Sequence, residues 1–360
     1  MNENPSTTQL SLESLSKYRS VLMGLEILLI IIFHFAEDCR TYEIHYVGGV
    51  QWFDIYIHSS GVDMFLLLSG LGLYFSMKKG PERKAFYKKR FQKLLIPYVI
   101  VAVPAWLWLD VIWEKSGVLT FLKDISFVSF FFQEKRWFWY ILMAGVCYVV
   151  FPYIFNLVEQ ARDRAEEKLR IMSLCLLTTV VLILLELYHH DLYVNISIAV
   201  TRFPAFFAGV LIGKAVYEKR RISVGGVAAL AVSAVILAGP LGLADKSIIG
   251  VYMAGFVNFC LCLVFVLVLT WMSRSRFCLL RGTERGIFLI LGWFGKYTLE
   301  LYLIHVAVRR IMKTLGFYTY RLSWEGIMIL ISLVLALVLH KMTDGIFKQL
   351  EKRKARKVNR

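Results

Sequence analysis

The stretch Arg19-Ser-Val-Leu-Met-Gly-Leu-Glu-Ile-Leu-Leu-Ile-Ile-Ile-Phe-His34 decides the class of fold to which this chain belongs. It is an apolar helical segment that continues to residue 36. It holds a carboxylic acid, Glu26, in its interior and an imidazole, His34, near its end. Ionisable groups at membrane depth are costly, so those that are present are candidates for function. Polar residues recur in the same way inside other apolar runs of the chain.

The composition is that of a membrane protein. Of the 360 residues, 58% are hydrophobic, and several runs reach the roughly 20 apolar residues that a helix needs to cross a bilayer. The sequence therefore predicts an all-α polytopic integral membrane protein, with one domain over residues 1–360. Because residues 1–18 are polar and the run after them is long enough to span, we expect a short cytoplasmic N-terminus and no cleavable signal peptide.

Hydropathy predicts about ten membrane-spanning helices, without a strong internal repeat. Their approximate bounds are 20–36, 60–77, 94–113, 137–158, 171–188, 198–217, 223–243, 247–271, 287–308 and 325–346.

Basic segments between the spans predict the orientation, because cytoplasmic loops carry an excess of Lys and Arg. With ten spans, five such segments fall on one side: 78–93, 162–170, 219–221, 274–285 and the tail 347–360. We therefore expect both termini in the cytoplasm. Four bases conflict with this rule, so either they form a functional basic rim on the outside or the last two spans are misdrawn. These are Arg309, Arg310, Lys313 and Arg321.

The net charge of +16 follows from these loops, so nucleic acid is not an expected partner. The tail and the 78–93 loop are suited to anionic lipid headgroups, and the loop also to a phosphorylated donor. The six cysteines show neither metal nor disulfide spacing, and we expect no metal site. The chain has no Gly-x-Ser-x-Gly elbow, Walker A loop, His-Glu-x-x-His motif or dinucleotide fingerprint.

The predicted topology brings four polar side chains to one depth near the outer face. They are His34 at the end of the first span, Asp63 at the start of the second, Arg202 at the start of the sixth and His305 near the end of the ninth. Such a set is suited to acyl transfer: a neutral imidazole takes a hydroxyl proton, a carboxylate orients the imidazole, and an Arg or Tyr donor stabilises an oxyanion.

Each of these residues also has a structural interpretation. His34 is equally compatible with an interfacial residue, and His305, with Tyr302 three residues before it, with a hydrogen-bonded core histidine. Asp63 and Arg202 are suited to a structural ion pair. The aromatic residues that open the fourth span are typical of the membrane interface. These are Trp137, Trp139 and Tyr140.

Six segments, in order along most of the chain, resemble the integral membrane acyltransferase-3 family of O-acyltransferases. They are Phe33-His34, Gly61-Val-Asp-Met-Phe-Leu-Leu-Leu-Ser-Gly70, the basic stretch Phe86–Tyr98, Trp139-Tyr140 followed by Phe151-Pro152, Arg202-Phe-Pro-Ala-Phe-Phe-Ala-Gly209, and Tyr297-Thr-Leu-Glu-Leu-Tyr-Leu-Ile-His305.

The resemblance implies about ten helices around a central pore and a cytosolic acyl-CoA donor, usually acetyl-CoA. It implies a hydroxyl of an extracytoplasmic or lipid-linked saccharide as acceptor, and no permanently bound cofactor. His34 matches the central catalytic residue. The other motif positions that we carry over as catalytic candidates are Asp63, Arg202, Tyr302 and His305.

The chain departs from the family at one place. Many members carry an arginine ten or eleven residues before the histidine, where this chain has Gly24 and Met23. The nearest arginine is Arg19, about 22 Å from His34 along a straight helix. We expect Arg19 at the cytosolic mouth, either as a positive anchor or, with Arg83 and Arg90, as a site for CoA phosphates.

The sequence thus favours an inner-membrane O-acetyltransferase in which His34 is either the base or a transient acyl carrier. Two other classes remain open. A transporter or flippase of a lipid-linked sugar would use the same intramembrane charges as a substrate path, although no inverted repeat is evident. A scaffold or sensor for a partner protein would need none of this chemistry.

Overall fold

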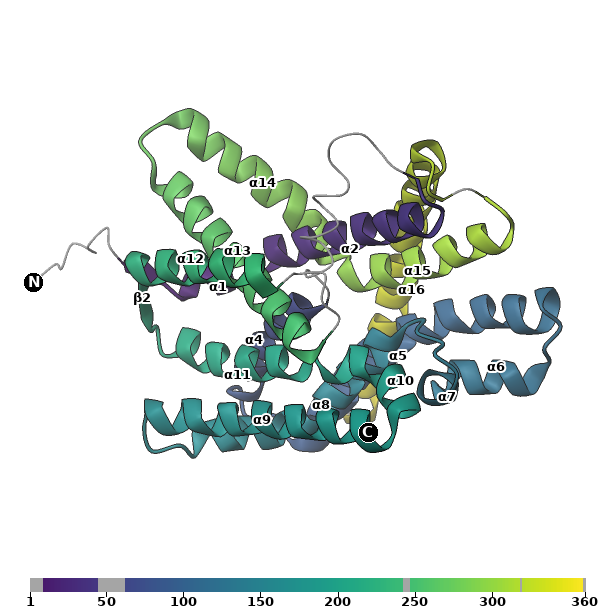
Figure 1. The fold of residues 1–360 in the computed structure, drawn as a ribbon, viewed down its shortest axis with the longest axis horizontal. Helices are drawn as coiled ribbons and strands as arrows, with labels where there is room; N and C mark the ends of the chain where they lie inside the picture. The colour runs from purple at the N-terminus through teal and green to yellow at the C-terminus, as the bar shows by residue number, and fades with distance from the viewer. Residues whose placement is uncertain (1–8, 45–61, 242–246, 318, 359–360) are drawn as a thin grey trace, which may run out of the picture.

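The computed structural model describes residues 9–44, 62–241, 247–317 and 319–358 (Figure 1). Residues 1–8 of the expected N-terminus, residues 60–61 at the start of the second predicted span, residues 242–243 at the end of the seventh, and residues 359–360 of the tail lie outside the described residues. The described chain is almost entirely helical and has one pair of short antiparallel strands, in which Gln9 faces Ser223.

The elements follow one another in this order: β1 (Gln9–Ser11), α1 (Glu13–Lys17), α2 (Arg19–Thr41), α4 (Asp63–Met77), α5 (Arg83–Trp106), the π-helix η1 (Leu107–Trp113), α6 (Val118–Ile125), α7 (Val128–Phe132), α8 (Trp139–Glu159), α9 (Arg164–Tyr188), α10 (His190–Val200), α11 (Phe203–Tyr217), β2 (Arg221–Ser223), α12 (Val224–Leu241), α13 (Ile248–Arg274), α14 (Cys278–Lys296), α15 (Thr298–Thr314) and α16 (Leu322–Val358).

The expectation of an all-α polytopic membrane protein agrees with these helices, but the count of ten spans and a central pore are not confirmed. Among the described residues, seven helices are long and apolar enough to cross a membrane, or eight if the bent pair α14 and α15 forms one span. Two further apolar helices are shorter, at Asp63–Met77 and within α12 at Val224–Ala234.

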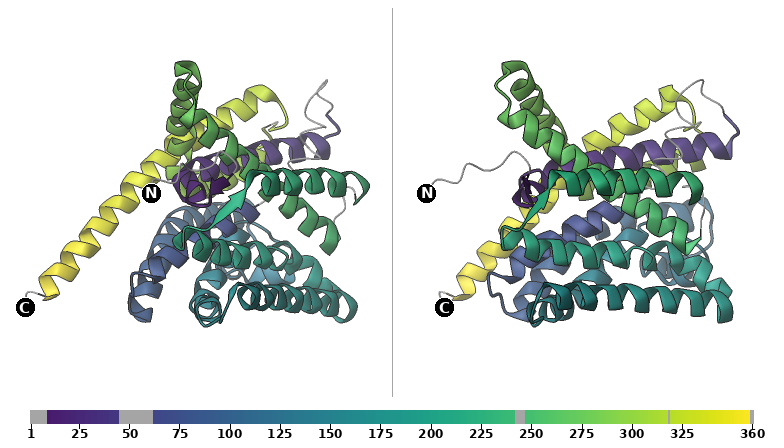
Figure 2. Two further views of the ribbon diagram at one scale, coloured as in Figure 1. Left: turned by 90° about the vertical axis from the view of Figure 1, so that its left-hand side faces the viewer. Right: turned by 60° about the vertical axis from the view of Figure 1, so that its left-hand side comes forward.

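The helices form two packed groups. One contains α4, α8, α9, α10 and α11, and lies in the lower part of Figure 1. The other contains α2, α14, α15 and α16. Contacts of α2 with α4, and of α5 with both α8 and α15, join the groups. The C-terminal part of α16 projects beyond the other helices (Figure 2).

The sequence-based spans miss three features. The span predicted at 287–308 is broken, with α14 and α15 meeting at 65°. Residues 9–11 pair with residues 221–223, which ties the N-terminal segment to the α11–α12 connection. The helix predicted to end at 346 continues to Val358, so the expected basic tail is largely helical.

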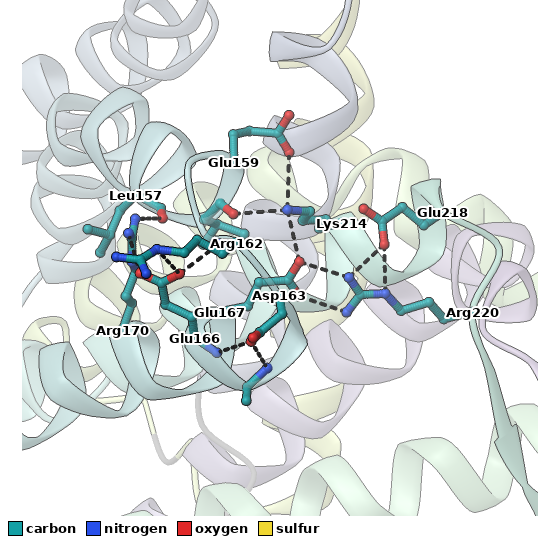
Figure 3. A network of polar contacts seen from close by, with 12 residues as sticks. Leu157, Glu159, Arg162, Asp163, Glu166, Glu167, Arg170, Lys214, Glu218 and Arg220 are labelled. Atoms are coloured by element: carbon teal, nitrogen blue, oxygen red, sulfur yellow. Dashed lines mark hydrogen bonds and ion pairs between the residues drawn. The ribbon is translucent and has the colours of Figure 1, made fainter.

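A network of ion pairs joins α8, α9 and α11 at the end of the molecule that carries the strand pair (Figure 3). The buried Nζ of Lys214 lies 2.9 Å from Glu167, whose other oxygen lies 2.8 Å from Arg220. Glu159 accepts from Lys78 at 2.7 Å. These contacts bring basic segments before α5, before α9 and after α11 to the same end of the bundle, as the loop charges predicted.

Glycine allows α11 to lie directly on the backbone of α4. A Cβ atom at Gly209 would lie 2.1 Å from the carbonyl oxygen of Leu67. We expect Gly209→Ala to cost about 1–3 kcal/mol through overpacking. Thermal unfolding of the detergent-solubilised protein measures this loss. Gly286→Ala is the matched control, because a Cβ there has no atom within 4 Å, and equal unfolding temperatures for the two variants would contradict the packing.

Candidate active site

A cavity of about 790 Å³ receives the end of α2 that carries His34. The His34 side chain is 23% exposed and lines this cavity. Its wall also contains aromatic and basic side chains from three other parts of the chain. They include Trp137 just before α8 and Trp139 at its start, Arg202 before α11, and Tyr302, Arg309, Arg310 and Lys313 of α15. We call it the outer cavity, after the side on which the sequence predicts His34.

Two charged groups meet the same ring nitrogen of His34. Its Nδ1 lies 3.2 Å from Oε2 of Glu37 and 3.1 Å from Nη1 of Arg309. A protonated Nδ1 donates to the carboxylate and leaves Nε2 with a lone pair for a hydroxyl proton, whereas donation by Arg309 to Nδ1 favours the opposite tautomer. The imidazole can therefore serve as a base in the first state, whereas in the second its Nε2–H can only donate a hydrogen bond.

Asp38 anchors Arg309 behind the cavity wall. Its carboxylate accepts from Nε and Nη2 of Arg309 at 2.9 and 2.5 Å, from Lys313 at 2.6 Å and from Thr319 at 2.7 Å. This arrangement accounts for bases that conflicted with the loop-charge rule: Arg309 and Lys313 pair with acids on α2 at the same end as His34. Sequence reasoning did not single out Glu37 or Asp38, although Glu37 follows His34 by three residues and so shares its helical face.

His305 lies beside His34, as the predicted topology expected. The two ring centroids are 5.3 Å apart. His305 is completely buried, and in the described part of the structure neither of its ring nitrogens has a hydrogen-bond partner. Its burial leaves the structural interpretation open, and its position places a second imidazole beside the first.

Asp63 and Arg202 form a close ion pair, with 2.5 Å between Oδ2 and Nη1. Asp63 is buried at the start of α4, whereas Arg202, just before α11, also lines the outer cavity. The carboxylate that contacts His34 is thus Glu37 and not Asp63. Arg202 therefore reaches the cavity with its positive charge balanced by the buried carboxylate of Asp63.

A second cavity, of about 280 Å³, lies near the beginning of α2, and we call it the inner cavity. Arg19 and Arg90 line it together with Tyr140 and Tyr148. Tyr302 lines both cavities, and its ring meets that of Tyr140 edge-on at 5.3 Å. The two cavities therefore approach each other at Tyr302.

The inner cavity explains how the chain differs from the family pattern before His34. A Cβ atom at Gly24 would lie 1.8 Å from the carbonyl oxygen of Leu291 on α14, so an arginine does not fit there. Met23 faces the inner cavity, and the cation that α2 contributes to it is Arg19, which donates to the carbonyl of Leu68 at 3.1 Å. Arg83 does not line either cavity, and its guanidinium lies over the ring of Tyr153.

Glu26 lies away from both cavities. It is completely buried, and the Nδ2 of Asn258 approaches both carboxylate oxygens at 3.3 and 3.4 Å. The thiol of Cys262 also donates to Oε1 of Glu26, at 3.5 Å. Within the described ranges, no group of three or more His, Cys, Asp or Glu side chains is arranged to hold a metal ion.

Comparison with known proteins identifies the family of the chain. No curated protein and no solved structure matches the chain. The model of the acyltransferase-3 family, described as an acyltransferase domain, matches residues 21–341, which include both cavities apart from the side chain of Arg19. With nearly its whole length matched, and with apolar helices that place it among multi-pass membrane proteins, the chain belongs to the acyltransferase-3 family.

Proposed function

We propose that the protein moves an acyl group, acetyl in the first instance, from cytosolic acyl-CoA to a hydroxyl of an extracytoplasmic or lipid-linked saccharide. We place it in the inner membrane with both termini in the cytoplasm. The observation that carries the proposal is Tyr302, which lines both an arginine-bearing cavity at one end of α2 and the His34 cavity at the other. A donor and an acceptor that approach from opposite sides would meet there.

In this proposal the phosphates of CoA bind near Arg19 and Arg90, and the thioester reaches towards Tyr302. Nε2 of His34 takes the proton of the acceptor hydroxyl while the oxygen of that hydroxyl attacks the thioester carbonyl. The carbon–sulfur bond then breaks, and the CoA thiolate leaves and is protonated by the imidazolium. Tyr302 or Arg202 stabilises the oxyanion. In the alternative path the imidazole itself accepts the acyl group and passes it to the hydroxyl.

Sealed membrane vesicles of known orientation test the function. Radiolabelled acetyl-CoA is supplied on one face and a cell-envelope glycan extract on the other. We expect label on the glycan only when acetyl-CoA meets the face that carries the N-terminus. Movement of a lipid-linked sugar without any need for acyl-CoA would favour a transporter instead.

The donor site gives a separate prediction. Arg19→Gln and Arg90→Gln are each expected to raise KM for acetyl-CoA by about tenfold, because a charge-assisted contact to phosphate is lost. Neither should change KM for acetyl-pantetheine, which lacks the nucleotide phosphates. Initial rates with both donors measure the difference. Arg281→Gln, an exposed base on α14 that lines neither cavity, is the control. Equal effects on both donors would contradict a phosphate site.

A further inference from the structure

The outer cavity is strongly basic. Six cationic and two anionic side chains line it, and two further carboxylates, Asp38 and Asp63, lie behind its wall. Asp63 balances Arg202. Asp38 is shared between Arg309 and Lys313. Even with these acids counted, positive charge exceeds negative charge around the cavity.

Arg310 lines the cavity without a carboxylate partner among the described residues. It is exposed and lines the cavity. Its guanidinium lies 4.9 Å from the ring centroid of Trp137, and no carboxylate in the described part of the chain pairs with it. Arg136, by comparison, has Glu134 at 4.0 Å. A guanidinium that lines a cavity without a carboxylate partner can offer its donors to an anion.

The aromatic residues hold this guanidinium in place without using its donors. Trp137 stacks on Trp106, with ring centroids 4.3 Å apart and planes 22° from parallel. A guanidinium over an indole is stabilised through its face, so its N–H groups remain available at the edge for a planar carboxylate or a phosphate. Trp137 also lines the cavity, so the guanidinium that it supports lies at the cavity wall.

The position of Arg310 relates this anion site to the reacting hydroxyl. Arg310 follows Arg309, whose guanidinium contacts His34 at 3.1 Å. In the proposed function the phosphates of the donor bind at Arg19 and Arg90, which line the inner cavity near the beginning of α2. An anion in the outer cavity therefore belongs to the acceptor rather than to CoA.

Building on the proposed function, we propose that the acyl acceptor is an anionic saccharide whose carboxylate or phosphate is bound by Arg310 beside Trp137 while a hydroxyl of the same molecule meets His34. The anion has two chemical sources: a uronate carboxylate within the glycan, or the phosphate that links a sugar to its lipid carrier.

The test uses the cell-envelope glycan extract as acceptor for membranes that contain the full chain. One portion has its carboxyl groups reduced to alcohols, and a second is dephosphorylated with aqueous hydrofluoric acid. We expect one of these treatments to lower acetyl transfer by at least about tenfold, and the treatment that does so identifies the source of the anion.

Arg310→Gln is expected to raise KM for the untreated extract by about 10- to 100-fold and to leave KM for acetyl-CoA unchanged. Arg310→Lys should restore part of the loss, and Arg276→Gln, which removes an exposed base outside both cavities, should have no effect. Full transfer to both treated extracts, with Arg310→Gln equal to Arg276→Gln, would overturn the inference and leave the enzyme class in place. Absence of transfer by the unaltered protein to any extract would overturn both.

Discussion

Replacement of His34 by alanine is expected to lower acetyl transfer by about 10²- to 10⁴-fold if the imidazole is a general base. If the imidazole carries the acyl group, transfer should fall to the level of membranes without the protein. The fold should persist, because the side chain faces the outer cavity and its polar contacts are with Glu37 and Arg309. These two keep their ion pair with each other, and Arg309 also keeps Asp38 as a partner. Label transferred from radioactive acetyl-CoA, at matched amounts of membrane protein, measures the effect.

The matched control is His190→Ala, which removes an exposed histidine at the start of α10 that lines neither cavity. Equal transfer by the His34→Ala and unaltered proteins would remove the imidazole from the mechanism and make His305 the next residue to replace. Label on the protein itself, formed without acceptor, absent from His34→Ala and released by hydroxylamine, would distinguish an acyl-histidine from a general base.

Much of the site follows from hydropathy and loop charge. Apolar runs predicted α2, α8 and α13, and the alternation of basic loops placed His34, Arg202 and His305 at one depth. The structure brings the two histidines to 5.3 Å and Arg202 into the same cavity. The depth of these residues could be predicted because a span fixes the depth of each residue along it. Their proximity within the membrane plane depends on how the helices pack, which the structure supplies.

The features that sequence missed depend on which helices pack against each other. The sequence shows only that Gly24 stands where many family members carry an arginine. The reason appears in the structure, where the backbone of α14 lies directly against Gly24. The break between α14 and α15 carries no proline, and the two helices together are long and apolar enough to be taken for one span. Arg309 conflicted with the loop-charge rule because its partner Asp38 is 271 residues away in sequence. Pairing at such separation leaves no local pattern to detect.

Glu37 and Asp38 are neighbours in sequence, yet their replacement should have different effects. Glu37 contacts Nδ1 of His34, so Glu37→Gln should lower kcat by about 10²- to 10⁴-fold with little change in KM. The neutral amide can donate to Nδ1, which stabilises the unproductive tautomer, and it no longer balances an imidazolium. Glu37→Asp, which keeps the charge, should recover part of the rate. Initial rates and thermal unfolding in detergent measure both variants.

Asp38 binds Arg309, Lys313 and Thr319 rather than the imidazole, so Asp38→Asn should act first on stability. Leaving two cations at the end of α15 without their shared carboxylate is expected to cost about 3–5 kcal/mol, the range for breaking a buried ion pair. A lower unfolding temperature for Asp38→Asn, with the unfolding temperature of Glu37→Gln unchanged, would separate the positioning carboxylate from the structural one. If Glu37→Gln instead loses stability and keeps its kcat once folded, Glu37 does not position His34, and its carboxylate acts only on the stability of the fold.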